Sequence, residues 1–272
     1  SPPFVMKTRN NQFEGYAIDL INELSRVARF NYTLYPTPDE AYGQSDKSGK
    51  PSGMVQELFM RRADFAIGDL IKSQTRERYI DFSDSFMDID LTALINKKNI
   101  ANMTSFAHLV NNTNITYGVL REGDTFRFMS MSLNPTIANM HRYIYMNGFN
   151  LVNSRQEGVE RALNTNYAFI QESVANEYAM DQNCELTAIE DKQEINRREY
   201  AIGLQKGSPY KSDIDRAIQQ LRNDGTLNRL KRKYWRTKCL TNSDMMSVNA
   251  KLDAITSLSL IASALISYIL FN

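Results

Sequence analysis

The sequence has few residues of the types that build metal or nucleophile sites. It contains two histidines, His108 and His141, and no CxxC, HExxH or GxSxG motif. A zinc site needs several His or Cys ligands, and a serine hydrolase of the common α/β type needs the last of these motifs. The acidic stretch from Asp81 to Asp90 lacks the glycine and terminal glutamate of an EF-hand loop. We therefore expect that the chain binds no metal or cofactor and that it is not an enzyme.

An excess of charge of either sign is also missing. The chain has 32 Lys and Arg residues against 31 Asp and Glu residues, a formal net charge of +1. This balance creates no overall field that would attract nucleic acid. The basic run from Lys231 to Arg236 stands at the end of an expected helix, where positive charge complements the helix dipole. We expect no nucleic-acid partner, and a neutral, small or zwitterionic ligand fits better.

Cysteine is equally scarce. The two cysteines, Cys184 and Cys239, are either separate buried thiols or one disulfide, and the residues alone leave both open. A disulfide would close a loop of roughly 55 residues and restrict the unfolded chain by about 4 kcal/mol. Acceptor sequons for N-glycosylation favour an extracellular protein. They lie at Asn31, Asn102, Asn111 and Asn114.

One long apolar run occurs, at residues 254–271, after a polar stretch at 241–253 that we interpret as a linker. As a helix the run would extend about 27 Å, close to the thickness of the hydrocarbon core of a bilayer. Three interpretations stay open: a membrane helix, the signal for a glycolipid anchor, or a buried helix. The run is apolar on all faces, which disfavours the last of these. The first two attach the chain to a membrane.

The rest of the sequence alternates between helical and strand patterns. Residues 15–30 place apolar side chains on one helical face, and helices are also expected at 53–61, after Gly123, and at 157–163, 175–180, 212–222 and 226–235. Expected strands are FNYTLYP at 30–36, ADFAIG at 63–68, LTALIN at 91–96, ITYGVL at 115–120, FNLV at 149–152, YAFIQ at 167–171 and YAIGL at 200–204. This alternation predicts an α/β fold with mixed, mostly parallel sheets covered by helices on both faces. Ligands of such sheets bind beyond the carboxyl ends of the strands.

Two features have the chemistry to bind an anion. Gly123–Thr125 lies where an expected strand gives way to a helix, so that free backbone N–H groups and the helix dipole can receive a carboxylate. The alternative interpretation is an ordinary helix cap formed by Asp124 or Thr125. Arg76 follows another expected strand, and its planar guanidinium matches the fork of a carboxylate. Taken alone, Arg76 also fits a surface arginine.

Read in order, several blocks resemble the ligand-binding domain of ionotropic glutamate receptors of the AMPA/kainate-like kind, from Pro3 to Cys239. They are PPFVM, QFEGYAIDLINEL, PSGMVQELFMRRADFAIG, RERYIDFSDSFM, ITYGVLREGDT, QEGVERAL, YAFIQESVANEY and KRKYW. The resemblance implies a two-lobed clamshell like that of periplasmic binding proteins, with residues 1–88 and 203–240 in lobe 1 and 89–202 in lobe 2. It also implies a disulfide between Cys184 and Cys239. The pore segment of the family would fall near Lys98 to Met103 and is absent.

The resemblance further implies a set of ligand-binding residues. Arg76 matches the arginine that binds the α-carboxylate of the ligand, and Glu172 matches the acid that pairs with the α-ammonium. Thr125 and the N–H groups after Gly123 match the site for the distal carboxylate. Phe13 matches an aromatic wall beside the carbon chain of the ligand, and Tyr200 lines the pocket near the hinge.

Three positions depart from the family pattern. Asp69 replaces a proline whose carbonyl accepts from the ammonium, and that carbonyl is retained. Ile71 replaces a threonine, which removes one hydrogen bond to the α-carboxylate, or about 1 kcal/mol. Asp124 replaces a small residue and would repel glutamate unless its side chain caps the helix or pairs with Arg121. The expected ligand is therefore glutamate or a small neutral amino acid.

The resemblance implies the amino-acid sensor of a ligand-gated ion channel, on the extracellular side of the plasma membrane. Closure of the cleft on the ligand would be the signal, and other receptor subunits are possible partners in homo- or hetero-oligomers. The alternative is a transport-type solute-binding protein for a polar amino acid, because the same clamshell serves solute uptake.

Overall fold

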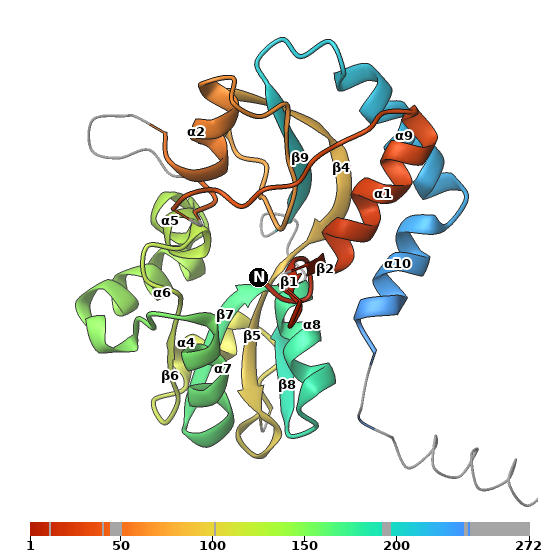
Figure 1. The fold of residues 1–272 in the computed structure, drawn as a ribbon. Helices are drawn as coiled ribbons and strands as arrows, with labels where there is room; N and C mark the ends of the chain where they lie inside the picture. Colours follow the sequence, from red (N-terminus) through yellow and green to blue (C-terminus); the bar gives the residue numbers. More distant parts are fainter. Residues whose placement is uncertain are drawn as a thin grey trace, which may run out of the picture.

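Two lobes make up the part of the chain that the structure describes (Figure 1). The structure is a computed structural model, and it describes residues 1–10, 12–39, 41–43, 51–100, 102–191, 197–236 and 239. We define each lobe by its main sheet. The expected linker at 241–253 and the apolar run at 254–271 lie outside the described residues. Among the described helices, none combines the length and apolarity that crossing a membrane requires.

Lobe 1 is built around a sheet with the strand order β3-β9-β4. Its elements are β1 (Met6–Lys7), β2 (Phe13–Glu14), α1 (Tyr16–Ala28), α2 (Gly53–Phe59), β3 (Phe65–Ala66), α3 (Gln74–Glu77), β4 (Ile80–Ile89), β9 (Arg198–Gln205), α9 (Lys211–Asn223) and α10 (Thr226–Tyr234). Side chains alternate between the two faces of a strand. Tyr200 and Ile202 of β9 therefore pack with apolar residues of α1, α9 and α10, whereas Ala201 packs with α2.

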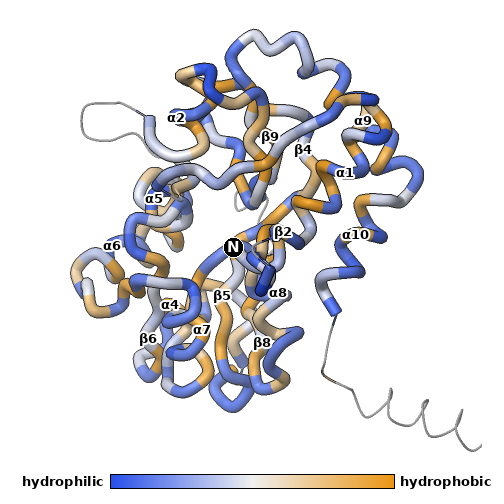
Figure 2. The backbone as a smooth tube through the Cα atoms, viewed as in Figure 1, coloured by the Kyte–Doolittle hydropathy of each residue, from blue (hydrophilic) through white to orange (hydrophobic). Residues whose placement is uncertain are grey.

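Lobe 2 is built around a sheet with the strand order β6-β7-β5-β8. Its elements are β5 (Leu91–Asn96), η1 (Lys97–Asn99), α4 (Phe106–Asn111), β6 (Thr116–Gly118), α5 (Asp124–Met131), α6 (Pro135–Met146), η2 (Gly148–Asn150), α7 (Arg155–Asn164), β7 (Tyr167–Glu172), α8 (Ser173–Gln182) and β8 (Leu186–Glu190). All residues of β5 and β7 are buried, because helices cover both faces of this sheet. Figure 2 shows β5 as an apolar strand in the middle of the lobe.

Most of the expected helices and strands are present. In α1 the side chains of Leu20, Ile21 and Leu24 are buried, and the helix ends at Arg29, whose φ of 56° is left-handed. The turn between α9 and α10 contains Gly225 with a φ of 77°, a conformation that glycine adopts without a steric penalty. The strong helical periodicity of these segments therefore predicts their structure correctly.

The expectation of mostly parallel sheets is wrong. Among the described strand pairs of the two main sheets, only β6 and β7 are parallel; β3–β9, β4–β9, β5–β7 and β5–β8 are antiparallel. A parallel pair needs a long crossover connection, usually a helix. Asp90 alone separates β4 from β5, however, and β9 returns from lobe 2 to lobe 1 beside β4 in the opposite direction.

Two of the expected strands do not form. Residues 31–37 have no strand hydrogen bonds, and half of the Tyr35 side chain is exposed. Pro36 lacks the N–H group that a strand ladder needs. Within FNLV, the 3-10 turn η2 replaces a strand, and only Val152 forms an isolated parallel bridge, with Leu120.

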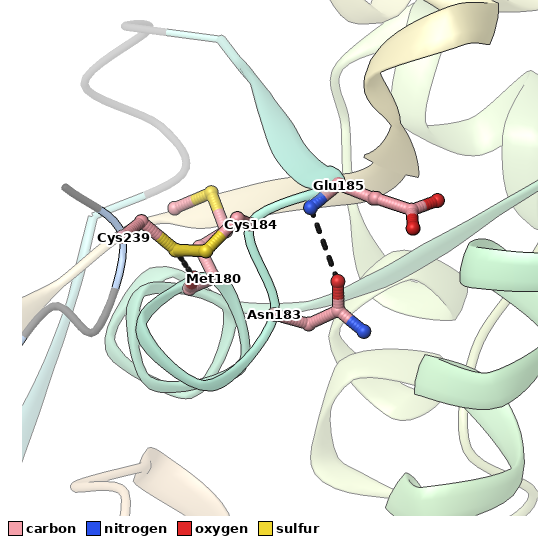
Figure 3. The surroundings of a disulfide bond; sticks show 5 residues. All are labelled: Met180, Asn183, Cys184, Glu185 and Cys239. Carbon is pink, nitrogen blue, oxygen red and sulfur yellow. Dashed lines mark hydrogen bonds between the residues drawn. A yellow bond between two sulfur atoms is a disulfide. The ribbon is translucent and has the colours of Figure 1, made fainter. Parts of the chain in front are cut away.

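The predicted disulfide between Cys184 and Cys239 is confirmed (Figure 3). Its Cα atoms are 5.3 Å apart, and it joins the end of α8 in lobe 2 to the chain that follows α10 of lobe 1. Two further contacts connect the same helices. Trp235 Nε1 donates to the carbonyl of Val174 at 2.7 Å, and Lys231 forms an ion pair with Glu177 at 2.7 Å. On this side the two lobes are thus fastened together.

A close approach of α7 to β7 gives the first testable prediction. A Cβ atom at Gly158 would lie 2.6 Å from ring atoms of Phe169, a side chain that is fully buried. Alanine is the better helix former by about 1 kcal/mol. Overpacking costs about 1–3 kcal/mol in a filled core, so we expect Gly158→Ala to lower the free energy of unfolding. Urea unfolding followed by circular dichroism measures this change.

The control substitution is Gln156→Ala in the same helix, where the side chain is exposed. It should change the free energy of unfolding by less than about 0.5 kcal/mol. A Gly158→Ala variant as stable as the wild type would show that α7 can move away from β7 without penalty.

Candidate functional site

Arg76 lies at the face of lobe 1 that meets lobe 2. It is 4% exposed and belongs to α3, a single helical turn capped by Ser73. Its Nη1 donates to the carbonyl of Ile71 at 2.8 Å, and its Nε donates to the carbonyl of Gly43 at 3.2 Å. The backbone of lobe 1 therefore fixes two of the three guanidinium nitrogens. The third nitrogen, Nη2, makes its contact in lobe 2.

Asp124 of lobe 2 is the partner of this third nitrogen. Arg76 Nη2 donates to both carboxylate oxygens of Asp124, at 2.8 and 3.2 Å. Asp124 is the first residue of α5, where the helix dipole also favours a negative charge. Pairing of Asp124 with Arg121 was one expectation from the sequence. In the structure Arg121 does not pair with Asp124. Its Nε donates to Asn153 Oδ1 at 3.2 Å.

Glu172 lies at the end of β7 and is buried. Both oxygens of its carboxylate accept hydrogen bonds. Its Oε1 accepts from the hydroxyl of Thr125 at 2.9 Å and from Arg198 Nη2 at 3.5 Å. Its Oε2 accepts from Arg155 Nη2 at 3.4 Å. Thr125 directly follows Asp124 in α5, so a continuous chain of contacts leads from Arg76 to Glu172.

Asp69 forms a further ionic contact between the lobes. Its side chain is 1% exposed and accepts from Arg155 Nη1 at 2.9 Å. The hydroxyls of Ser1, at 2.6 Å, and of Tyr42 also donate to it. The sequence resemblance assigned the backbone carbonyl of Asp69 to the ligand, whereas the carboxylate has a partner of its own. Together, these ion pairs link three arginines, Arg76, Arg155 and Arg198, with three carboxylates.

Sequence reasoning missed two residues of the site, Arg198 and Arg155. Arg155 had a signal in the sequence. It is the first residue of α7, next to the N-cap Ser154. A positive charge is unfavourable at this end of a helix. An arginine at the start of a helix indicates acidic partners elsewhere in the fold, and this is the feature of the sequence that points to Arg155.

The remaining expected site residues divide into two groups. Ile71 and Tyr200 are buried and form an isolated antiparallel bridge close to Arg76, whose Nη1 contacts the carbonyl of Ile71. The Tyr200 ring packs edge-on against Phe4, with ring centroids 5.2 Å apart. Phe13 is separate from these contacts, because it lies on the wall of a cavity within lobe 1.

The larger of the two cavities described here lies apart from the ion pairs of Arg76 and Glu172. A cavity lined by Arg76, Val55 and Arg127 measures about 10 Å³, which holds one water molecule at most. The cavity that contains Phe13 measures about 500 Å³ and is lined mainly by apolar side chains, among them Tyr42 and Met54. In this conformation Asp124 occupies the side of Arg76 that faces lobe 2.

Electrostatics keep the buried acids ionised. Burial raises the pKa of Glu172, but Arg198 and Arg155 outweigh burial, so that its pKa lies below the usual value. Burial also raises the pKa of Asp69, but Arg155 and the hydroxyl hydrogen bonds bring this pKa below its usual value. The pKa of Tyr200 lies well above its usual value, first because of burial and then because of the nearby carboxylates. Tyr200 is thus a neutral phenol at physiological pH.

These shifts predict how stability depends on pH. The pKa values of Asp69 and Glu172 are lower in the folded chain than in the unfolded chain, where they are about 3.9 and 4.3. The ionised acids therefore contribute their full stabilisation above about pH 5, and the contribution is lost as the pH falls. We expect the difference in unfolding free energy between the wild type and Asp69→Asn to shrink as the solution is acidified.

Urea unfolding from about pH 7 down to about pH 3 tests this expectation. The control is Glu160→Gln, which removes an exposed carboxylate of α7. Its difference from the wild type should stay small throughout. A difference for Asp69→Asn that is independent of pH would contradict the assigned pKa shift.

Comparisons with known proteins find similar sequences and a similar fold. Residues 1–99 match the family described as the ligated ion channel L-glutamate- and glycine-binding site. Human glutamate receptor ionotropic, kainate 1, is 25% identical over 360 residues, and the match covers 89% of this chain and 39% of the receptor. Glutamate receptor ionotropic, kainate glr-3 of Caenorhabditis elegans is 25% identical, with 87% of this chain and 42% of the receptor covered. The chain thus spans about two fifths of the length of these relatives.

A solved structure is similar as well. It is described as the Drosophila muscle GluRIIB complex with glutamate, and it matches with a TM-score of 0.79 and 26% identity over 87% of this chain and 96% of that one. The fold has two lobes, with a cluster of buried ion pairs where they meet. The chain is similar in sequence and in fold to the ligand-binding domains of ionotropic glutamate receptors. The alignment with human kainate 1 is longer than this whole chain, so that receptor has residues with no counterpart here.

Proposed function

We propose that the chain binds a free amino acid between its lobes, with L-glutamate as the first candidate. Closure of the lobes on the ligand is the signal. The observation that carries the proposal is the chain of contacts from Arg76 of lobe 1 through α5 to Glu172 of lobe 2. The α-carboxylate and α-ammonium of an amino acid are complementary to this cation and this anion. The names of the relatives support glutamate.

Placing the two charges on different lobes explains why binding would produce movement. A ligand that contacts Arg76 and Glu172 makes both contacts fully only when the lobes are close together. It therefore binds the closed form more tightly and shifts the population towards it. Phe13, Thr125 and Tyr200 are the further ligand contacts in this proposal, as the resemblance implies.

We assign this sensor to the extracellular side of the plasma membrane, in an assembly with other receptor subunits. The four sequons support an extracellular location, because their asparagines are all exposed. These are Asn31, Asn102, Asn111 and Asn114. The disulfide supports it too, since such bonds persist in oxidising compartments. Gating of a channel would belong to the assembly, because the segment of the family that forms the pore is absent here.

Calorimetric titration of the full chain with glutamate, glycine, alanine and serine tests the proposal. We expect glutamate to bind and Arg76→Ala to weaken binding about 30-fold or more, because truncating one partner of a buried charge pair costs about 2–5 kcal/mol. Arg78→Ala is the matched control. Arg78 is an exposed arginine two residues away, so its removal should leave binding unchanged.

The outcome also distinguishes between ligand classes. Binding of the neutral amino acids alone would make Asp124 a group that selects against a second carboxylate. No binding of any of the four amino acids, either by the wild type or by the Asp124→Ser variant described below, would overturn the assignment.

A further inference from the structure

The cleft already contains, from its own side chains, both charges that an amino acid would bring. The carboxylate of Asp124 occupies the Nη2 side of Arg76. The guanidinium of Arg155 contacts Glu172 and Asp69, the two acidic residues at the ammonium end of the proposed site. Asp124 thus corresponds to the ligand carboxylate, and Arg155 corresponds to the ligand ammonium.

Both side chains also connect the lobes. Asp124 opens α5 and Arg155 opens α7, two helices of lobe 2 that begin at the boundary between the lobes (Figure 1). Their partners Arg76 and Asp69 belong to lobe 1. The two bridges have opposite polarity, with the anion on lobe 2 in one and on lobe 1 in the other. Each pair joins lobe 2 to lobe 1, so a movement of lobe 2 away from lobe 1 stretches both pairs.

Burial explains why such bridges matter. The side chains of Arg76, Asp69 and Glu172 are between 1% and 5% exposed. A buried charge without a partner is strongly unfavourable, so a closed cleft without ligand needs counter-charges from elsewhere. Asp124 and Arg155 supply them, and the three arginines balance the three carboxylates. The closed arrangement is thus electrically complete without any ligand.

We propose that Asp124 and Arg155 form a built-in substitute for the ligand, which holds the cleft closed and which an incoming amino acid must displace. This inference rests on the proposed function for the identity of the ligand, but the closure of the empty cleft does not. The ligand carboxylate competes with Asp124 for Arg76, and the ligand ammonium competes with Arg155 for Glu172. The chain itself thus holds the resting cleft shut. The ligand binds when these pairs open, and the cleft then closes again on the charges of the ligand.

Competition of this kind lowers the apparent affinity. The apparent dissociation constant equals the intrinsic one divided by the fraction of molecules whose site is free, and a minor state populated at 0.1–10% is common. Freeing Arg76 by Asp124→Ser should therefore lower the Kd for glutamate about tenfold or more. Asp124→Asn keeps the shape of the side chain and should act in the same direction. Titration calorimetry of the full chain measures these changes.

The second measurement does not depend on ligand. Small-angle X-ray scattering of the full chain without amino acid should give a larger radius of gyration for the double variant Asp124→Ser/Arg155→Gln than for the wild type. The matched control is Glu160→Gln/Arg142→Gln, which removes one exposed acid and one exposed arginine of lobe 2. This control should scatter like the wild type. Circular dichroism establishes that each variant is folded.

The outcomes separate the two proposals. Expansion of the double variant supports the built-in substitute even if no chain binds glutamate, a result that would overturn only the proposed ligand. Conversely, unchanged scattering together with a wild-type Kd in Asp124→Ser and Asp124→Asn would overturn the substitute while leaving glutamate binding intact. Expansion accompanied by tighter binding of glutamate supports both.

Discussion

A buried guanidinium is stable only where acceptors and a counter-charge surround it, and Arg76 brings this constraint to the contact between the lobes. The backbone of lobe 1 satisfies two nitrogens through the carbonyls of Ile71 and Gly43. The third nitrogen faces the other lobe and needs an anion. Asp124 satisfies it in this structure, and a ligand carboxylate is its natural competitor. This contact holds the start of α5 against lobe 1.

The two acidic departures from the family pattern have a shared explanation. Asp69 and Asp124 stand where the family has a proline and a small residue, and taken singly each introduces an unexplained negative charge. In the structure each has a partner on the opposite lobe, Arg155 for Asp69 and Arg76 for Asp124. The unfavourable position of Arg155 at the start of α7 is thereby compensated by two carboxylates. The departures thus belong to one electrostatic arrangement.

Sequence reasoning predicted what depends on local pattern. The helices around Leu20 and Ile218 follow from apolar spacing, and Arg76, Thr125 and Glu172 follow from motif positions. Arg155 could not be assigned in this way, because its partner Asp69 lies 86 residues away and spacing does not encode such contacts. Strand direction was mispredicted for a similar reason. A run of apolar residues does not tell which neighbour it will pair with, so the return of β9 beside β4 became visible only in the fold.

The disulfide and the contacts of α10 have a mechanical consequence. α10 packs with the core of lobe 1, yet Cys239, Trp235 and Lys231 are all attached to α8 or its end in lobe 2. The residues that follow Cys239 along the chain therefore start from a point that is anchored to lobe 2. A displacement of lobe 2 relative to lobe 1 pulls on this point directly. The covalent bond thus makes Cys239 move together with lobe 2, although the helix that precedes it packs on lobe 1.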